Sequence, residues 1–341
     1  MNYYVERIGQ VVLVFCITVT ISFAMYRFLP GGPVEIIIDQ LSRQMSETGE
    51  VDPEQFERVA KLVETYTNIR PDKPWYLAYI DYWREIIFHQ DFGTSIRKRQ
   101  PVTALIMSRL PWSIFISVYG LALGVSTSLL FGAVMAHNEG GFFDQAMTVI
   151  TISTNTVPYY IVAILSLIVF AFELGWFPSG GKITPGTTPG FNYPYVAGLV
   201  EHAALPILSS FIAGFGGALA YRGNCIREMG KGYLRVAELR GISEARMAIR
   251  YVGRNALLPI YTGLMLGLAA LFGSSIILEV IFQYQAMGLL TFEALQNRDY
   301  PLLMGTFIFY TVITLLGILI ADLTYGIIDP RVKSGDEREV Y

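Results

Sequence analysis

Charged residues are scarce in this 341-residue chain: they form 16% of the sequence, whereas soluble globular domains carry about 25%. Hydrophobic residues make up 53%, and the mean hydropathy is +0.44. This balance excludes a disordered chain and disfavours an ordinary water-soluble enzyme. The net charge of −3 gives no general attraction to nucleic acid, so we expect no nucleic-acid partner. The composition points to lipid as the solvent.

Cysteine and histidine are also rare. The two cysteines, Cys16 and Cys225, lie far apart in the sequence, so they suggest neither a disulfide framework nor a metal cluster. The three histidines, His89, His137 and His202, are scattered as well. We therefore expect no catalytic metal site.

The short motifs of nucleotide and hydrolytic chemistry are absent. A phosphate-binding loop needs Gly-x-x-x-x-Gly-Lys followed by Ser or Thr, and the segments Gly180–Ile183 and Gly230–Gly232 both have the wrong spacing. Neither His-Glu-x-x-His nor Gly-x-Ser-x-Gly occurs. We predict that the chain is not an enzyme and holds no cofactor, so energy for any pumping must come from another protein.

Long apolar runs are what the sequence does contain. A helix needs about 20 apolar residues to cross the hydrocarbon core of a bilayer, and helices satisfy their own backbone groups there. The alternating polarity of a barrel strand is missing. The fold class predicted is an all-α polytopic membrane protein with six transmembrane helices. The six runs without Asp, Glu, Lys or Arg are Ile8–Tyr26, Trp112–Ala136, Gln145–Phe172, Ala203–Tyr221, Asn255–Leu278 and Tyr300–Ala321.

The charges between the runs predict the orientation. The segment Arg222–Arg254 holds eight basic and three acidic residues, so the positive-inside rule makes it cytoplasmic. With six spans, the N- and C-termini are then cytoplasmic too. The segment Gly31–Arg109 is external, which its length allows, because segments beyond about 60 residues cross largely regardless of charge.

The chain divides around these spans. The external region is expected to hold a helix that begins near Asp52 and an amphipathic helix over Trp75–Ile86, the second lying on the membrane. Its aromatic residues form a small core or an interfacial belt, with direct ligand binding as the alternative. The predicted divisions are an N-terminal transmembrane helix (1–30), an external helical region (31–110), a transmembrane core (111–326) with a cytoplasmic loop (222–254), and a cytoplasmic tail (327–341).

The cytoplasmic loop carries the most information. Two helical stretches flank Gly241-Ile242-Ser243, where Gly241 can end the first helix and Ser243 can cap the second. Ala237 and Gly241 are four residues apart, and this spacing predicts a helix face with little bulk that another backbone can approach. The loop is interpreted as a lever between a cytoplasmic partner and the spans. The alternative is an ordinary basic loop that attracts anionic lipid.

The residues of this loop, and motifs elsewhere in the chain, resemble those of a known family. Ala237, Gly241-Ile242-Ser243 and Arg254–Pro259 resemble the coupling loop of ATP-binding-cassette (ABC) importer permeases of the oligopeptide/dipeptide/nickel family. The resemblance covers nearly the whole chain. Departures are Gly32 for a usual Asp, Arg235 for a Glu, Gln285-Ala286 for Pro-Gly and Leu289 for Arg. The other matching motifs are Arg27–Pro33, Asp91–Ser95, Pro101-Val102, Arg109–Pro111, Gly175–Pro178, His202–Pro206, Glu279–Phe282, Met287-Gly288 and Arg298–Leu302.

The resemblance implies a type I ABC importer permease fold with an external helical insertion after the first helix. It implies a prokaryotic cell membrane location and three kinds of partner besides lipid: a second homologous permease, two ATPase subunits that bind ATP and Mg, and an external substrate-binding protein. The residues that it implies for coupling to the ATPase are Ala237, Glu238, Gly241, Ile242, Ser243 and Glu244.

The substrate implied first is a di- or oligopeptide, with an oligosaccharide as the alternative and nickel third. Alternatives of a different class are an intramembrane enzyme and an ion channel or scaffold. The sequence does not define which residues line the substrate pathway.

Overall fold

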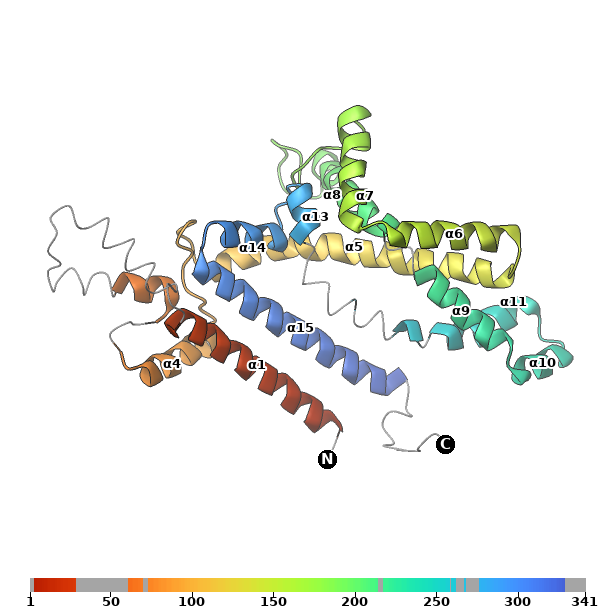
Figure 1. Cartoon of the computed structure of the whole chain (residues 1–341), viewed down its shortest axis with the longest axis horizontal. Helices are drawn as coiled ribbons and strands as arrows, with labels where there is room; N and C mark the ends of the chain where they lie inside the picture. Colours follow the sequence, from red (N-terminus) through yellow and green to blue (C-terminus); the bar gives the residue numbers. More distant parts are fainter. Residues whose placement is uncertain are drawn as a thin grey trace. The chain divides into compact units, whose positions relative to one another are not determined.

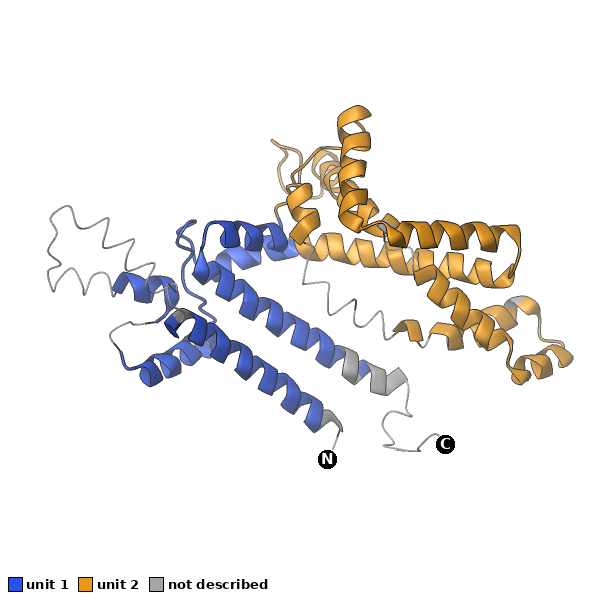
Figure 2. Cartoon of the chain, viewed as in Figure 1, with its two compact units in different colours: residues 1–111, 286–341 blue, residues 112–285 orange. Residues whose placement is uncertain are grey.

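A computed structural model describes residues 3–28, 61–69, 73–213, 217–257, 259–261, 267 and 276–328. These residues are mainly helical, and their β-structure is one isolated bridge between Thr94 and Pro101. The chain forms two compact units: unit 1 comprises residues 1–111 and 286–341, and unit 2 comprises residues 112–285 (Figure 2).

Unit 1 is built around two long helices that lie side by side, α1 and α15 (Figure 1). Val19 and Phe23, in the second half of α1, pack with Ile308, in the first half of α15, so the two helices run antiparallel. Tyr82 of α4 completes this core. The elements of unit 1 are α1 (Tyr3–Phe28), a helix over residues 61–67, α4 (Trp75–Arg84), η1 (Glu85–His89), the start of α5 (Val102–His137), α14 (Met287–Gln296) and α15 (Tyr300–Ile328).

A second core in unit 1 joins the beginning of α5 to α14 and α15. Val102 and Ile106 of α5 pack with Leu290 of α14 and Leu302 of α15. Gly305 permits this approach, because a Cβ at that position would lie 2.5 Å from a methyl carbon of Val102.

Unit 2 contains the rest of α5 and a series of shorter helices. The elements that follow α5 are α6 (Phe142–Thr156), α7 (Tyr159–Ser166), η2 (Leu167–Glu173), α8 (Tyr193–Ala213), α9 (Gly217–Met229), α10 (Gly232–Leu239), α11 (Glu244–Arg246), η3 (Met247–Gly253) and α13 (Ile276–Ile281).

Four of the described helices are long and apolar enough to cross a membrane, and the number rises to five if one bent pair counts as a span. The first and last predicted runs coincide with helices of this kind, and the second, Trp112–Ala136, lies within a helix that begins ten residues earlier, at Val102. The candidate spans are Val5–Met25, Val102–His137, Tyr193–Ile212 and Tyr300–Ile320. Most of the predicted run 255–278 lies outside the described residues, so the predicted count of six is not tested.

The third predicted run, Gln145–Phe172, is not one straight helix. Helix α6 ends at Thr156, α7 begins at Tyr159, and the pair is bent by 94°. Val157 is extended, with φ −84° and ψ 123°, because the ring of Pro158 disfavours the helical conformation in the residue before it. Pro158 therefore breaks an apolar run that composition alone treats as continuous.

Two other predicted boundaries shift. Helix α8 begins at Tyr193, ten residues before the predicted start at Ala203, because the charge-free run is interrupted at Glu201 while the helix continues through it. The amphipathic helix predicted from Trp75 is present as α4, continued by η1. The predicted helix start near Asp52 lies outside the described residues.

Candidate functional site

The turn after α10 has the geometry that its glycine predicts. The amide of Ile242 donates to the carbonyl of Ala237 at 3.2 Å, and the amide of Gly241 donates to Glu238 at 2.9 Å. This pair of bonds is the Schellman motif that ends a helix on a left-handed residue. Gly241 has φ +72°, a conformation that glycine adopts without steric cost. The prediction that Gly241 ends this helix is confirmed.

Ser243 occupies the position before the first residue of α11. Its backbone is extended, with φ −62° and ψ 145°, and its carbonyl accepts from the amide of Met247 at 3.0 Å. The side chain makes no capping hydrogen bond. Ser243 therefore stands at the predicted helix start, but the predicted side-chain bond is not formed.

The inner face of α10 packs within the loop itself. Leu234 and Ala237 are its buried residues, and Ala237 is only 6% exposed. The shared small-residue face predicted for Ala237 and Gly241 is therefore wrong: the chain's own packing covers Ala237, whereas Gly241 is exposed with open space around it. The hydrophobic core cluster that includes Leu234 also contains Ala136, Tyr221, Cys225, Val252 and Ala256.

Helices α10 and η3 each expose apolar and basic side chains. Leu239 is 82% exposed, Ile249 is 74% exposed and Val236 is 49% exposed. Arg235 and Arg240 are exposed between the apolar side chains of α10. Large apolar residues exposed in a group, with polar residues around them, are typical of a surface that another protein covers. Among the other predicted coupling residues, Glu238, Ser243 and Glu244 are exposed and Ile242 is partly exposed.

A polar chain ties α10 to the elements on both sides of it. Lys231 pairs with Glu228 at 2.5 Å, and the Tyr233 hydroxyl donates to the same carboxylate at 2.9 Å. The Asn255 side-chain amide then donates to the Tyr233 oxygen at 3.0 Å. Lys231 holds the pKa of Glu228 below its usual value, so the carboxylate is ionised at neutral pH. These bonds connect α10 to α9 and to the helix that follows η3.

A bidentate ion pair fixes the beginning of the loop. Arg222 of α9 donates to both carboxylate oxygens of Asp144, at 2.5 and 2.6 Å. The amide of Gly140 adds a third bond to this carboxylate at 2.9 Å. Asp144 is 3% exposed, and its hydrogen bonds with the guanidinium raise the pKa of Arg222. Paired guanidinium–carboxylate bonds are directional, so they orient α9 against α6. Nothing in the sequence pattern signalled this pair.

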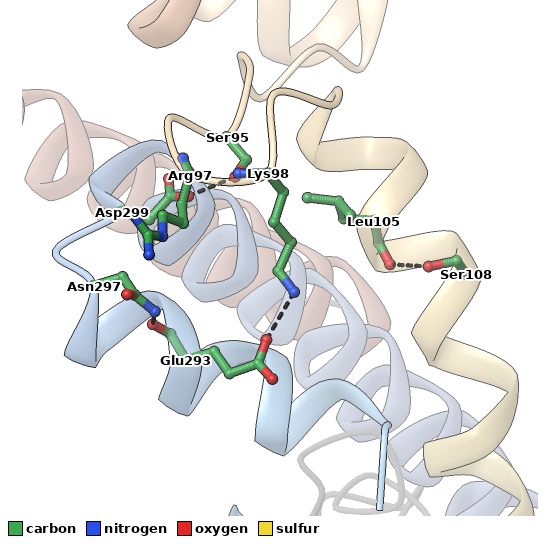
Figure 3. Close-up of polar contacts among 8 residues, drawn as sticks. All are labelled: Ser95, Arg97, Lys98, Leu105, Ser108, Glu293, Asn297 and Asp299. Atoms are coloured by element: carbon green, nitrogen blue, oxygen red, sulfur yellow. Dashed lines mark hydrogen bonds and ion pairs between the residues drawn. The ribbon is translucent and has the colours of Figure 1, made fainter.

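A second polar cluster, in unit 1, was also missed (Figure 3). Asp299, directly before α15, accepts from the Ser95 hydroxyl at 2.5 Å and from the amides of Ile96 and Arg97 at 3.2 and 3.1 Å. It also accepts from the amide of Leu302 at 3.4 Å. The cluster joins the Asp91–Ser95 motif to the Arg298–Leu302 motif, whose contacting residues are 204 positions apart.

Gly93 explains part of the first motif. Its φ is +86°, and a Cβ there would lie 2.2 Å from the Tyr66 carbonyl oxygen. Asp91 accepts from the Gly93 amide at 2.8 Å, and the Thr94 amide donates to Tyr66 at 3.2 Å. Only glycine fits this close backbone approach.

An apolar groove of about 680 Å³ lies in unit 2 between α5 and α8. Phe115, Tyr119, Phe191 and Tyr195 line it together with aliphatic residues, and no charged residue does. The charged ends of a peptide would find no counter-charge there, so the groove suits hydrocarbon or an apolar helix face. Among the described residues, no group of three or more His, Cys, Asp or Glu is placed to hold a metal ion.

These features define a class: a helical, polytopic membrane protein with an exposed basic loop. Residues 128–334 match the model of the family described as "Binding-protein-dependent transport system inner membrane component", and the chain belongs to that family.

Two curated relatives cover nearly the full chain. The oligopeptide transport system permease protein AppB of Bacillus subtilis is 31% identical over 92% of this chain and 93% of its own length. The dipeptide transport system permease protein DppB of the same organism is 28% identical over 97% of this chain and 98% of its own length.

Proposed function

We propose that the chain is one of two permease subunits of an ATP-driven importer for di- and oligopeptides, forming half of the translocation pathway. The family and the transport systems in which the two relatives are named support a peptide substrate. The observation that carries the ATP-driven part is the exposed apolar and basic face of the 232–250 segment, which has no covering element among the described residues of its unit. An oligosaccharide importer of the same family is the alternative.

In this proposal the turn at Gly241 docks into a groove of a cytoplasmic ATPase subunit. Glu238, Ile242, Ser243 and Glu244 surround the contact, while Ala237 supports it from inside. Closure of two ATPase subunits around ATP and Mg moves the turn. The polar chain from Glu228 through Tyr233 to Asn255 passes that movement to the helix after η3. The external binding protein releases substrate into the opened pathway, and hydrolysis resets it.

The chain by itself is expected to bind no nucleotide and to move no substrate, because it lacks a phosphate-binding loop. The purified chain is reconstituted in liposomes and given a peptide mixture, ATP and an ion gradient. Uptake is compared with that of liposomes containing the full set of partners. Concentrative uptake by the chain alone would disprove the permease-subunit proposal and indicate a secondary transporter.

Both termini and the 222–254 loop are proposed to be cytoplasmic, and thiol labelling tests this. The native Cys225 is a poor reporter because it is 3% exposed, and burial raises the pKa of its thiol. In a Cys16→Ser/Cys225→Ser background, Leu239→Cys, at a position 82% exposed, is expected to react with a membrane-impermeant maleimide only in inside-out vesicles. Phe191→Cys lies between η2 and α8, in a segment that the proposed orientation places outside the cell, and as the matched reporter it is expected to react in intact cells. Reversed labelling of the two cysteines would overturn the orientation.

A further inference from the structure

Four basic residues gather at one place in unit 1. Arg97, Lys98 and Arg99 are consecutive, and Arg298 directly precedes the Asp299 that binds the backbone of this segment. Residues 96–99 together with Arg298 are called the basic turn. Lys98 pairs with Glu293 at 2.7 Å, whereas the exposed Arg97, Arg99 and Arg298 make no ion pair within the described parts of the chain.

The backbone of the basic turn is held in place. Asp299 accepts from the amides of Ile96 and Arg97, and the Lys98 amide donates to the Ser95 hydroxyl at 2.9 Å. Ser95, Lys98 and Asp299 lie together in Figure 3. Arg99 and Arg298 both have φ +52°, which is uncommon for residues with a side chain. A fixed backbone presents charged side chains to a ligand with less loss of entropy on binding.

The contacts of Asp299 set the level of the basic turn relative to the membrane. Asp299 caps α15, and the candidate span of that helix begins at the next residue, Tyr300. The antiparallel α1 ends its candidate span at Met25, on the same side. The basic turn therefore lies where apolar helix gives way to water, which is the depth of lipid headgroups.

Aromatic residues on α4 give independent support for this level. Trp83 of α4 packs edge-on to Phe15, at the middle of the α1 span, and Tyr79 of α4 packs against Phe23, so α4 lies along the second half of that span. Trp75 and Tyr76, at the start of α4, are 57% and 53% exposed. Exposed Trp and Tyr at the ends of membrane spans mark the membrane–water interface.

We propose that Arg97, Arg99 and Arg298 bind the phosphate headgroup of an anionic phospholipid. Arginine suits this ligand because its planar guanidinium donates paired hydrogen bonds to phosphate oxygens and is always charged. The depth of the turn and the neighbouring aromatic belt favour lipid over an acidic protein as the occupant. The proposal needs only the membrane location of unit 1 and not the peptide substrate.

Native mass spectrometry of the full-length protein, titrated with phosphatidylglycerol or phosphatidylcholine, tests the proposal. The unsubstituted chain is expected to prefer phosphatidylglycerol. The triple variant Arg97→Gln/Arg99→Gln/Arg298→Gln is expected to lose at least roughly tenfold of its phosphatidylglycerol affinity, since each basic residue near an anionic surface contributes about fivefold. Its phosphatidylcholine affinity is expected to be unchanged.

Two control variants distinguish binding by these particular arginines from a general effect of the protein's net charge. Arg97→Lys/Arg99→Lys/Arg298→Lys keeps the charge but not the paired guanidinium bonds, so it is expected to lose part of the phosphatidylglycerol preference, less than the glutamine variant loses. Arg235→Gln/Arg240→Gln/Arg250→Gln removes the same charge from exposed positions in unit 2 and is expected to leave the preference intact. If the Gln triple does not fold, as judged by its thermal midpoint, the three single substitutions are each expected to cost about fivefold.

Three results would overturn the lipid proposal. The first is an unsubstituted chain that does not distinguish the two lipids. The second is an equal loss of phosphatidylglycerol preference in the triple glutamine variants of unit 1 and unit 2, which would show that the preference depends on net charge alone. The third is a Gln triple that keeps its lipid preference while peptide uptake by the assembled transporter falls, which would assign the turn to a protein partner.

Discussion

Gly241→Trp is expected to lower transport-linked ATP hydrolysis of the assembled importer by at least roughly tenfold, equivalent to about 1.4 kcal/mol of docking energy. A Cβ at Gly241 meets no atom of this chain within 4 Å, so a tryptophan there has room to extend outward, toward the proposed ATPase groove. The amount of protein in the membrane is expected to persist, because the turn is exposed and contributes nothing to the loop core.

Gly241 has φ +72°, so any substitution there strains the backbone as well as adding side-chain volume. Two further variants distinguish these two effects. Any residue with a Cβ at a left-handed position costs about 1–2 kcal/mol, and asparagine tolerates it best. Gly241→Ala adds strain without bulk, and Gly241→Asn adds a small side chain with less strain. Both are expected to couple far better than the tryptophan variant.

Gly232→Trp is the matched control for the tryptophan itself. Gly232 is exposed in the same loop, meets no atom within 4 Å at its Cβ position, and does not have the left-handed conformation of Gly241. It is expected to retain coupling. Normal ATP hydrolysis in Gly241→Trp would contradict the docking assignment. A loss in Gly241→Ala as large as that in Gly241→Trp would attribute the effect to the helix end alone.

The loop could be predicted where local rules decide the structure. A glycine four residues after an alanine, followed by Ile-Ser-Glu, encodes a helix end and a helix start that involve only neighbouring backbone groups. The inward orientation of Ala237 could not be predicted from local sequence. It depends on where the neighbouring Leu234 packs, and the residues that Leu234 packs with, Cys225 and Val252, lie on other helices.

The distinction between local rules and contacts distant in sequence also explains the other features that the sequence analysis missed. Pro158 breaks an apolar run through purely local sterics, so the bend was available from the sequence, but a count of uncharged residues does not detect it. The Asp144–Arg222 pair joins residues 78 positions apart, and no periodicity connects them. The two motifs that Asp299 unites could be recognised separately, while their contact required the fold.

Asp299→Ala is expected to give the largest loss of stability in unit 1, about 3 kcal/mol. The carboxylate is 1% exposed, and its removal leaves the fully buried Ser95 hydroxyl and two amides of the basic turn without their acceptor. The cap on the first turn of α15 is lost at the same time. The thermal midpoint of the purified protein in one detergent is expected to fall by roughly 5–10 °C.

Glu293→Gln provides the comparison for Asp299→Ala, because it breaks the Lys98–Glu293 ion pair of the same turn. The Lys98–Glu293 side chains are 29% and 41% exposed, so this loss is expected to stay below about 1 kcal/mol. Ser95→Ala removes one donor and is expected to fall between the two. In a double-mutant cycle, Ser95→Ala should cost little once Asp299 is already alanine, since the bond between them is gone. Additive costs in that cycle, or equal midpoints for Asp299→Ala and Glu293→Gln, would show that the buried carboxylate does not hold the two motifs together.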